Sequence, residues 1–310
     1  MTRSLSIRTC SVELYGNGRV GGALVPLLRQ KGIRISSIRD RSGICHRGRI
    51  VGRSVLVDAT SPEYAGEAAE AWVARLEHAL SLGKPVVTCN KAPLALAWDR
   101  LIRAARRGGT TISCSASVGG GTPILLLLAR LHRSQRVRRV EASLNATLSH
   151  VCDRVSTGAS ISLAVEEARH TGIAEPDPSI DLDGTDAYAK SVIIHNLLFT
   201  DRNPLRLDSS RPRLDLDERT ILHFTQSSLP PRVVSEITPG AIDVALAAAP
   251  EMIARSAGRP AAAIRATLND GSRTTLTGPG AGPLATAGAL LADVLEIAEL
   301  ESRVAEGVLP

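Results

Sequence analysis

Aromatic side chains are scarce in this chain of 310 residues, which has two tryptophans, three tyrosines and two phenylalanines. Proteins that bind single-stranded nucleic acid stack its bases on aromatic rings, so the scarcity argues against a nucleic-acid partner. The chain is 44% hydrophobic and 22% charged. This balance is typical of a globular protein with a sizeable core. That core must therefore be built from aliphatic side chains.

Paired cysteines and long apolar runs are missing as well. The five cysteines show no C-x-x-C spacing, and their odd number favours reduced thiols in the cytosol. The first ten residues lack the apolar core of a signal peptide. The uncharged run at residues 274–292 is broken by glycine and proline, so it does not predict a membrane span. We expect a cytoplasmic protein with no membrane partner.

Lysine is also rare, since arginine supplies nearly all the positive charge behind a net charge of +6. The lysines are Lys31, Lys84, Lys91 and Lys190. The densest basic run, residues 130–139, reads better as an exposed helix end and strand start than as a phosphate-binding stripe. A diffuse positive balance suits an anionic small molecule or cofactor.

One lysine, Lys190, ends an acidic segment at residues 172–190. The carboxylates of this segment are Glu175, Asp177, Asp181, Asp183 and Asp186. A calcium loop of the EF-hand type would need a glutamate where Lys190 stands, so calcium fits poorly. Two interpretations remain. The segment is either an exposed loop that caps a helix carrying an i,i+4 Asp186–Lys190 pair, or it contains a catalytic aspartate–lysine pair.

Short apolar runs alternate with helical patterns in the first part of the chain. Apolar runs at residues 11–15, 33–40 and 54–58, and again near 86 and 112, predict strands. One helical pattern follows the first run, a second ends at residue 82, and a third covers residues 93–107. Strands that alternate with helices predict parallel βαβ units.

The pattern changes beyond residue 138. We expect a strand near residue 140, helices at 160–170 and 185–199, and an exposed segment at 203–218. Thr238 and Pro239 have the features of an N-cap and a first helical residue, so they predict a further helix. Residues 263–277 predict a hairpin that turns at Asn269–Gly271.

A G-x-G-x-x-G motif follows the first predicted strand and opens the first predicted helix. Glycines at these positions permit a tight turn and a close approach of backbone N–H groups to a pyrophosphate, and the helix N-terminus favours the negative charge. A purely structural glycine turn is the alternative. The predicted pyrophosphate site consists of Gly16, Asn17, Gly18, Arg19, Val20 and Gly21.

Asp40 follows the glycines by about 20 residues, where a ribose-binding acid is expected. Arg41 follows it directly. A carboxylate would hold the ribose hydroxyls of NAD, whereas an arginine would suit the 2′-phosphate of NADP, so either cofactor remains open. Thr60 and Ser61 follow a predicted strand at the edge where such sheets bind ligands.

Four segments together resemble the catalytic part of homoserine dehydrogenases. They are GKPVVTCNKAPLA, SASVGGGTPI, GIAEPDPSIDLDGTDAYAK and GPGAG, and they occur in the order found in that family. The acidic segment is the most specific, since Glu175, Asp186 and Lys190 keep the family spacing. The resemblance implies hydride transfer between a nicotinamide and C4 of homoserine or aspartate semialdehyde.

The resemblance also implies roles for individual residues. Lys190 would transfer the proton, as hydride chemistry on an aldehyde requires, and Asp186 would orient it. Lys91 would lie near the nicotinamide and Glu175 would hold the substrate ammonium. Further matches to family positions are Asn145 and Thr147, implied to bind substrate, and Gly282, implied to bring the C-terminal segment to the cofactor.

Three positions depart from the family pattern. Ser115 stands where a glutamate associated with a structural monovalent cation is usual, so we expect no metal. Ile173 replaces a tyrosine, and Ala146 replaces the glycine of an Asn-Gly-Thr stretch. These departures leave open a related oxidoreductase for another small amino or hydroxy acid. A non-catalytic nucleotide-binding protein is a second alternative, against which the retained lysines argue.

The expected fold is α/β, with a doubly wound parallel sheet of the Rossmann type and an inserted α+β domain. Residues 1–128 and 278–310 would form the dinucleotide-binding domain. Residues 129–277 would form a domain for substrate binding and dimerisation, as the resemblance implies. We therefore expect a homodimer that takes NADP or NAD and a small-molecule substrate.

Overall fold

A computed structural model describes residues 10–50, 52–199, 204–208, 213–224, 231–248 and 261–305. The chain divides into two compact units. Unit 1 consists of residues 1–121 and 282–310, and unit 2 of residues 122–281. The division drawn from the sequence put the breaks a few residues away, after 128 and after 277. No helix in the described part of the chain is long and apolar enough to cross a membrane.

Unit 1 contains a six-stranded sheet with the order β3-β2-β1-β4-β5-β6. Its strands are β1 (Cys10–Tyr15), β2 (Arg34–Asp40), β3 (Gly43–Arg47), β4 (Arg53–Asp58), β5 (Val86–Thr88) and β6 (Ile112–Ser113). All neighbours are parallel except β2 and β3. The expected doubly wound α/β sheet is confirmed, and the order reverses between β1 and β4. Ligands of such sheets bind outside the carboxyl ends of the strands at this reversal.

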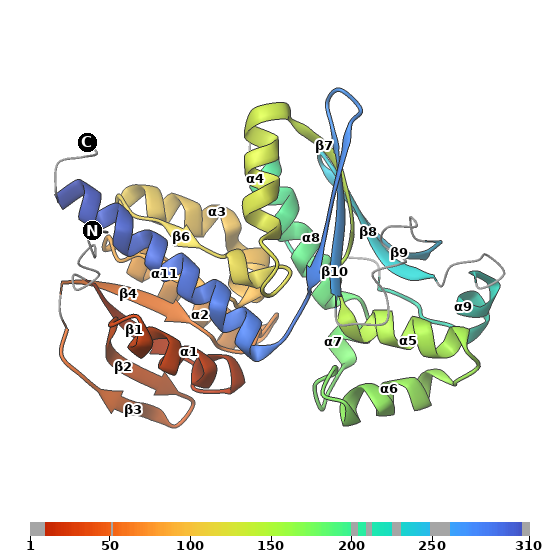
Figure 1. The fold of residues 1–310 in the computed structure, drawn as a ribbon, viewed down its shortest axis with the longest axis horizontal. Coiled ribbons are helices and arrows are strands. Elements are labelled where there is room, and N and C mark those ends of the chain that lie inside the picture. The colour runs from red at the N-terminus through yellow and green to blue at the C-terminus, as the bar shows by residue number, and fades with distance from the viewer. Residues whose placement is uncertain are drawn as a thin grey trace, which may run out of the picture. The chain divides into compact units, whose positions relative to one another are not determined.

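Helices cover both faces of this sheet. They are α1 (Arg19–Gln30), α2 (Gly66–Ser81), α3 (Lys91–Arg107) and α11 (Pro283–Ala305), with the 3₁₀ turn η2 (Ser115–Ser117). Since right-handed crossovers lead from β1 to one side and from β4 to the other, α1 lies on the face opposite α2 and α3. Figure 1 shows α11 beside α1, where Leu24 and Leu28 share an aliphatic core with Leu290 and Val294.

Unit 2 contains a five-stranded antiparallel sheet with the order β11-β10-β7-β8-β9. Its strands are β7 (Val137–Ser143), β8 (Arg232–Thr238), β9 (Ala241–Ala247), β10 (Ala261–Leu268) and β11 (Arg273–Pro279). Its helices are α4 (Ile124–Gln135), α5 (Ala146–Ser156), α6 (Ile161–His170), α7 (Ser179–Leu182), α8 (Thr185–Leu198) and α9 (Glu218–Phe224). The hairpin expected at Asn269–Gly271 is confirmed, with Gly271 at φ +84° between β10 and β11.

The helix expected to begin at Thr238 is wrong. Thr238 pairs with Ala241 as the last rung of the β8–β9 hairpin, and Pro239 and Gly240 form the turn. Proline followed by a glycine with positive φ is what a type II turn requires, and Gly240 has φ +88°. The backbone N–H of Gly240 donates to Nε2 of the buried His195 at 3.0 Å, which ties the turn to α8.

Several elements were missing from the sequence-based prediction, among them β3, α5 and β8. All five residues of β3 are exposed, so no alternation of apolar and polar side chains marks this edge strand. Helix α5 follows β7 closely and buries Leu148, Val151, Cys152 and Val155 on one face. Its N-cap and its apolar spacing were present in the sequence. The segment expected to be exposed at 203–218 lies partly outside the described residues, and within it Leu207 is buried.

Candidate active site

The three glycines of the G-x-G-x-x-G loop differ in how much space surrounds each of them. Gly16 has φ +96°, and a Cβ on it would lie 2.4 Å from the carbonyl oxygen of Ala59. A Cβ on Gly21 would lie 1.8 Å from the carbonyl oxygen of Gly16, so this glycine lets α1 approach β1. A Cβ on Gly18 would meet nothing within 4 Å. The space beside Gly18, at the N-terminus of α1, is therefore open to a ligand.

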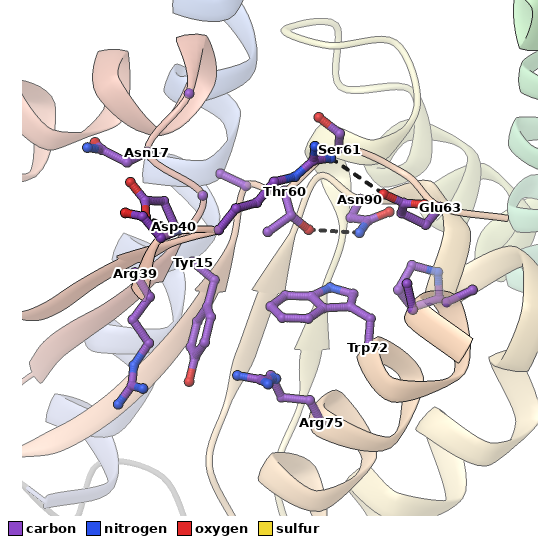
Figure 2. A pocket seen from close by; sticks show the side chains of 18 of the residues that line it. Tyr15, Asn17, Arg39, Asp40, Thr60, Ser61, Glu63, Trp72, Arg75 and Asn90 are labelled. Atoms are coloured by element: carbon purple, nitrogen blue, oxygen red, sulfur yellow. Dashed lines mark hydrogen bonds and ion pairs between the residues drawn. The ribbon is translucent and has the colours of Figure 1, made fainter. Parts of the chain in front are cut away.

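A cavity of about 800 Å³ opens at this loop, within the size range of small-molecule sites. Its walls come from the ends of β1, β2 and β4 and from α2 and α3 (Figure 2). The predicted residues that line it are Gly16, Asn17, Gly18, Asp40, Arg41, Thr60 and Ser61. Arg19, Val20, Gly21, Lys91 and Gly282 are not among its lining residues.

Asp40 lies at the end of β2 with its carboxylate already engaged. Its Oδ1 accepts hydrogen bonds from the backbone N–H of Ser42 at 2.8 Å and from Ser42 Oγ at 2.6 Å. Side-chain hydrogen bonds from Cys45 and Ser42 lower the pKa of Asp40, so the carboxylate stays charged. Arg41 is 88% exposed and lies 3.4 Å from Glu63, an acid on the cavity wall that the sequence did not point to.

Lys91 is the first residue of α3, and the structure shows what holds it there. Asn90 is the N-cap of α3, and its Oδ1 accepts from the backbone N–H of Ala92 at 3.0 Å. The amide of Asn90 donates to Thr60 Oγ1 at 3.0 Å, so the start of α3 is tied to the loop after β4. Asn90 lines the cavity and was not predicted, although an asparagine before a helix is a capping signal.

In unit 2, Lys190 and Asp186 lie on α8 as a buried pair. Lys190 is 9% exposed and Asp186 is 4% exposed. The ammonium Nζ of Lys190 lies 2.7 Å from Asp186 Oδ2 and donates to the carbonyl oxygen of Leu144 at 2.5 Å. The i,i+4 pair expected from the sequence is therefore present, but it is buried and not on an exposed helix surface. Burying a lysine and an aspartate is costly, so a buried pair of this kind is a candidate for a functional site.

Two predicted residues, Asn145 and Thr147, surround this pair, and so does an acid that was not predicted, Asp181. The amide of Asn145 donates both to Asp181 Oδ1 at 2.7 Å and to Asp186 Oδ2 at 2.9 Å. Thr147 Oγ1 donates to Asp181 Oδ2 at 2.8 Å. Burial raises the pKa of Asp181, and the charge of Asp186 raises it further. Two carboxylates around one ammonium give the cluster an excess of negative charge that suits a cationic group.

The remaining acids of residues 172–190 have other positions. Asp177 Oδ1 accepts from the backbone N–H of Ser179 at the start of α7. Asp183 Oδ1 accepts from the backbone N–H of Thr185 at the start of α8. Glu175 lies exposed between α6 and α7. Within the described residues, no group of three or more His, Cys, Asp or Glu side chains could hold a metal ion.

The C-terminal segment of unit 1 begins at Gly282, with φ +129°, just before α11. Ser115, which departs from the family pattern, binds a carboxylate of this helix. Its Oγ donates to Asp293 Oδ1 at 2.7 Å and its backbone N–H donates to Asp293 Oδ2 at 3.1 Å. Burial raises the pKa of Asp293. A direct bond between η2 and α11 thus occurs at the position where the family has a glutamate.

Comparisons with known proteins agree with these observations. A family model described as homoserine dehydrogenase matches residues 123–295. The homoserine dehydrogenase of Pyrococcus horikoshii is 26% identical over 92% of this chain and 96% of its own length. A protein of Pseudomonas canavaninivorans named NAD(+)-dependent homoserine dehydrogenase is 31% identical over 74% of this chain and 67% of its own length.

A solved structure of a hyperthermophilic archaeal homoserine dehydrogenase in complex with NADPH has a similar fold. It covers 94% of this chain and 98% of its own, with a TM-score of 0.74 and 26% identity. The family model spans more than half of the chain and includes Asn145, Asp186 and Lys190. The resemblance seen in the four sequence segments is confirmed, and the chain belongs to the homoserine dehydrogenase family.

Proposed function

We propose that the protein is an NAD(P)-dependent homoserine dehydrogenase that interconverts L-homoserine and L-aspartate 4-semialdehyde. The observation that carries the proposal is the buried Lys190–Asp186 pair with Asp181, in a chain that also has a dinucleotide-type cavity. The relatives described above are named homoserine dehydrogenases, and the similar solved structure of a hyperthermophilic archaeal homoserine dehydrogenase is a complex with NADPH. Unit 1 would bind the cofactor and unit 2 the substrate.

The residues of unit 1 fit a dinucleotide. The open space at Gly18 admits a pyrophosphate beside the N-terminus of α1. Asp40 would accept a hydrogen bond from a ribose hydroxyl, and Arg41 would contact a 2′-phosphate if it left Glu63. When bound, the nicotinamide supplies or accepts the hydride. NAD and NADP are both proposed as cofactors.

Lys190 is proposed to move the proton. Addition of hydride to the aldehyde carbon leaves a negative oxygen, which needs a proton donor close by. An ammonium held by Asp186 and by the carbonyl of Leu144 is oriented for this role. In the reverse direction the neutral amine would accept the proton of the alcohol. Lys91, at the start of α3 in unit 1, is proposed as a second catalytic lysine.

The substrate carries an ammonium group at its α-carbon, which requires negative partners. We propose that Glu175 holds this ammonium, with Asp186 beside the reacting end. Asn145 and Thr147 would fix the carboxylates of the cluster, since each donates to at least one of them. Asp181 joins this group because the same amide of Asn145 binds both acids.

The experiment that tests the function follows the formation and loss of reduced nicotinamide with purified protein. We expect turnover with homoserine and with aspartate semialdehyde, using NAD and NADP in parallel. A second candidate substrate class, another small amino or hydroxy acid, is favoured by Ile173, which lacks the hydroxyl of the family tyrosine. Turnover of such an acid but not of homoserine would select this alternative.

Two further features, the oligomeric state and the cellular compartment, are proposed. The protein would act as a homodimer, and light scattering after size-exclusion chromatography measures this directly. It would be cytoplasmic, a proposal supported by five cysteines that are all free. Cell fractionation tests the compartment.

A further inference from the structure

A buried carboxylate lies beneath the cavity and belongs to none of the proposed catalytic or binding groups. Asp58 is the last residue of β4 and is 0% exposed. Its Oδ1 accepts from the backbone N–H of Thr60 at 3.0 Å and from Thr60 Oγ1 at 2.6 Å. Its Oδ2 accepts from Trp72 Nε1 at 2.7 Å and from Thr88 Oγ1 at 2.9 Å. Four donors thus converge on one carboxylate from three different segments.

The donors lead directly to the cavity wall. Thr60 and Trp72 line the cavity themselves. Thr88 reaches it through Asn90, whose backbone N–H donates to Thr88 Oγ1 at 2.9 Å and whose amide donates to Thr60 Oγ1 at 3.0 Å. Each threonine hydroxyl therefore donates to Asp58 and accepts from Asn90. Figure 2 shows the Thr60–Asn90 bond at the mouth of the cavity.

The direction of these bonds depends on the carboxylate. Burial raises the pKa of Asp58, and the hydrogen bonds from Thr60, Trp72 and Thr88 oppose this rise. All four bonds have Asp58 as the acceptor, which is the arrangement that an ionised carboxylate requires. In this form it fixes both hydroxyl protons and leaves the hydroxyl oxygens to accept from Asn90. An amide in its place would direct an N–H group toward donors. At least one of the four bonds would then be lost or reversed.

The hydrogen bond from Trp72 to Asp58 also affects the part of the cavity wall that Trp72, Tyr15 and Arg75 form. Its ring meets Tyr15 edge to face with centroids 5.3 Å apart. The guanidinium of Arg75 lies 5.0 Å from the Trp72 ring and 5.2 Å from the Tyr15 ring. All three side chains line the cavity (Figure 2). The bond from the indole N–H to Asp58 sets how this ring faces the cavity.

We propose that Asp58 is a positioning residue for the nicotinamide cofactor, which it does not touch but whose binding walls it holds through Thr60, Trp72 and Asn90. This rests on the proposed function, in that the cavity is taken to bind the dinucleotide. Asn90 also caps α3, so Asp58, acting through Asn90, helps to fix the start of this helix, where Lys91 is the first residue. Cofactor affinity should therefore depend on Asp58 more than substrate affinity does.

The test compares two buried carboxylates of unit 1. Asp58→Asn removes the acceptor beneath the cavity. Asp293→Asn, the matched control, removes the carboxylate that binds Ser115 outside the cavity lining. We expect Asp58→Asn to raise the Kd and KM for NAD(P) about tenfold or more, as loss of a hydrogen bond to a charged group implies. The KM for homoserine at saturating cofactor should change less than about twofold, and Asp293→Asn should keep the parental cofactor Kd.

A spectroscopic signature accompanies the affinity change. The chain has two tryptophans, so a Trp98→Phe background leaves Trp72 as the only indole. In that background Asp58→Asn should shift the Trp72 emission to shorter wavelength, because the indole N–H loses the negatively charged acceptor that stabilises its excited state. Asp293→Asn should leave the emission unchanged.

A second variant decides the matter if Asp58→Asn does not fold. Thr88→Val keeps the shape of the side chain and removes only the hydroxyl that links Asp58 to Asn90. We expect it to raise the cofactor Kd about threefold or more, since the bond that Thr88 Oγ1 donates to Asp58 and the bond that it accepts from Asn90 are both lost. A folded Asp58→Asn protein, or failing it a Thr88→Val protein, with the parental Kd would overturn the positioning role. A parent protein that binds neither NAD nor NADP would instead overturn the proposed function.

Discussion

Lys190 is the residue at which charge and proton transfer can be separated. Arginine keeps the positive charge that pairs with Asp186, but a guanidinium does not release a proton near neutral pH. We expect Lys190→Arg to lower kcat by about 10²–10⁴-fold, the usual contribution of general acid–base catalysis. Cofactor affinity should persist because Gly18 and its loop belong to unit 1. Steady-state rates and a cofactor titration measure both.

The matched control for this variant is Lys31→Arg. Lys31 is exposed after α1, so this exchange should leave kcat unchanged. A Lys190→Arg enzyme that turns over homoserine at nearly the parental rate would refute the catalytic assignment. The buried pair would then be a structural feature of α8.

Arg41 provides a test of cofactor discrimination. It follows Asp40 and lines the cavity, yet it lies 3.4 Å from Glu63. If it turns to a 2′-phosphate, Arg41→Ala should weaken NADP binding by about 1.5–3 kcal/mol and NAD binding much less. Glu63→Gln should strengthen NADP binding, since it releases Arg41 for the 2′-phosphate. Equal losses for both cofactors in the alanine variant would show that Arg41 does not contact the 2′-phosphate.

At the scale of elements, η2 and α11 are joined without a glutamate. Ser115 donates to Asp293 through both its hydroxyl and its backbone N–H, so each carboxylate oxygen of Asp293 already has a hydrogen-bond donor from the protein. We therefore expect turnover to depend little on sodium or potassium. The measurement compares rates in chloride salts of sodium, potassium and a bulky organic cation at constant ionic strength. Strong activation by either metal ion would contradict this expectation.

The elements that could be predicted from sequence are those with a repeated apolar pattern. Strands β1, β2 and β4 and helix α3 have such patterns and are confirmed, as is the β10–β11 hairpin with its Asn-Asp-Gly turn. Strand β3 escaped prediction because it has no buried face. The helix expected at Thr238 failed because the same Thr-Pro-Gly residues satisfy both a helix start and a type II turn, and pairing with β8 selected the turn.

Residues of the candidate site were likewise predictable only where the sequence contained a recognisable pattern. The family resemblance pointed to Asp186 and Lys190, which the structure places in contact, but it gave no reason to single out Asp181 among neighbouring acids. Only the path of α5 brings Asn145 between the two carboxylates. Asp58 escaped for a related reason. A single acid at a strand end is unremarkable until three other segments are seen to donate to it.

At the scale of the whole molecule, the residues proposed for the two ligands belong to different units. Gly18 and Asp40, proposed to bind the cofactor, belong to unit 1, and the cluster of Lys190 and Asp186, proposed to act on the substrate, belongs to unit 2. Each unit has its own sheet. A change confined to one unit is therefore expected to affect one ligand and spare the other.

The last prediction applies this to Gly18. A Cβ there would meet no protein atom within 4 Å, and aspartate is a favoured N-cap, so Gly18→Asp should not destabilise α1. Its charge should repel the pyrophosphate and raise the cofactor Kd more than tenfold, whereas Gly18→Asn, which has the same shape without the charge, should have the smaller effect. Cofactor at 100 times its Kd stabilises a protein by about 2.7 kcal/mol.

Thermal unfolding with and without NAD(P) then measures the Tm of the whole molecule and its increase on cofactor binding. The parent should gain several degrees in Tm on adding cofactor, and the Gly18→Asp protein should start from the parental Tm and gain almost nothing. Gly21→Ala is the opposite case, since its Cβ would collide with the backbone of Gly16 and lower the Tm before any ligand is added. If Gly18→Asp retained the full thermal shift, the cofactor would have to bind away from the N-terminus of α1, and the cavity would lose its assignment.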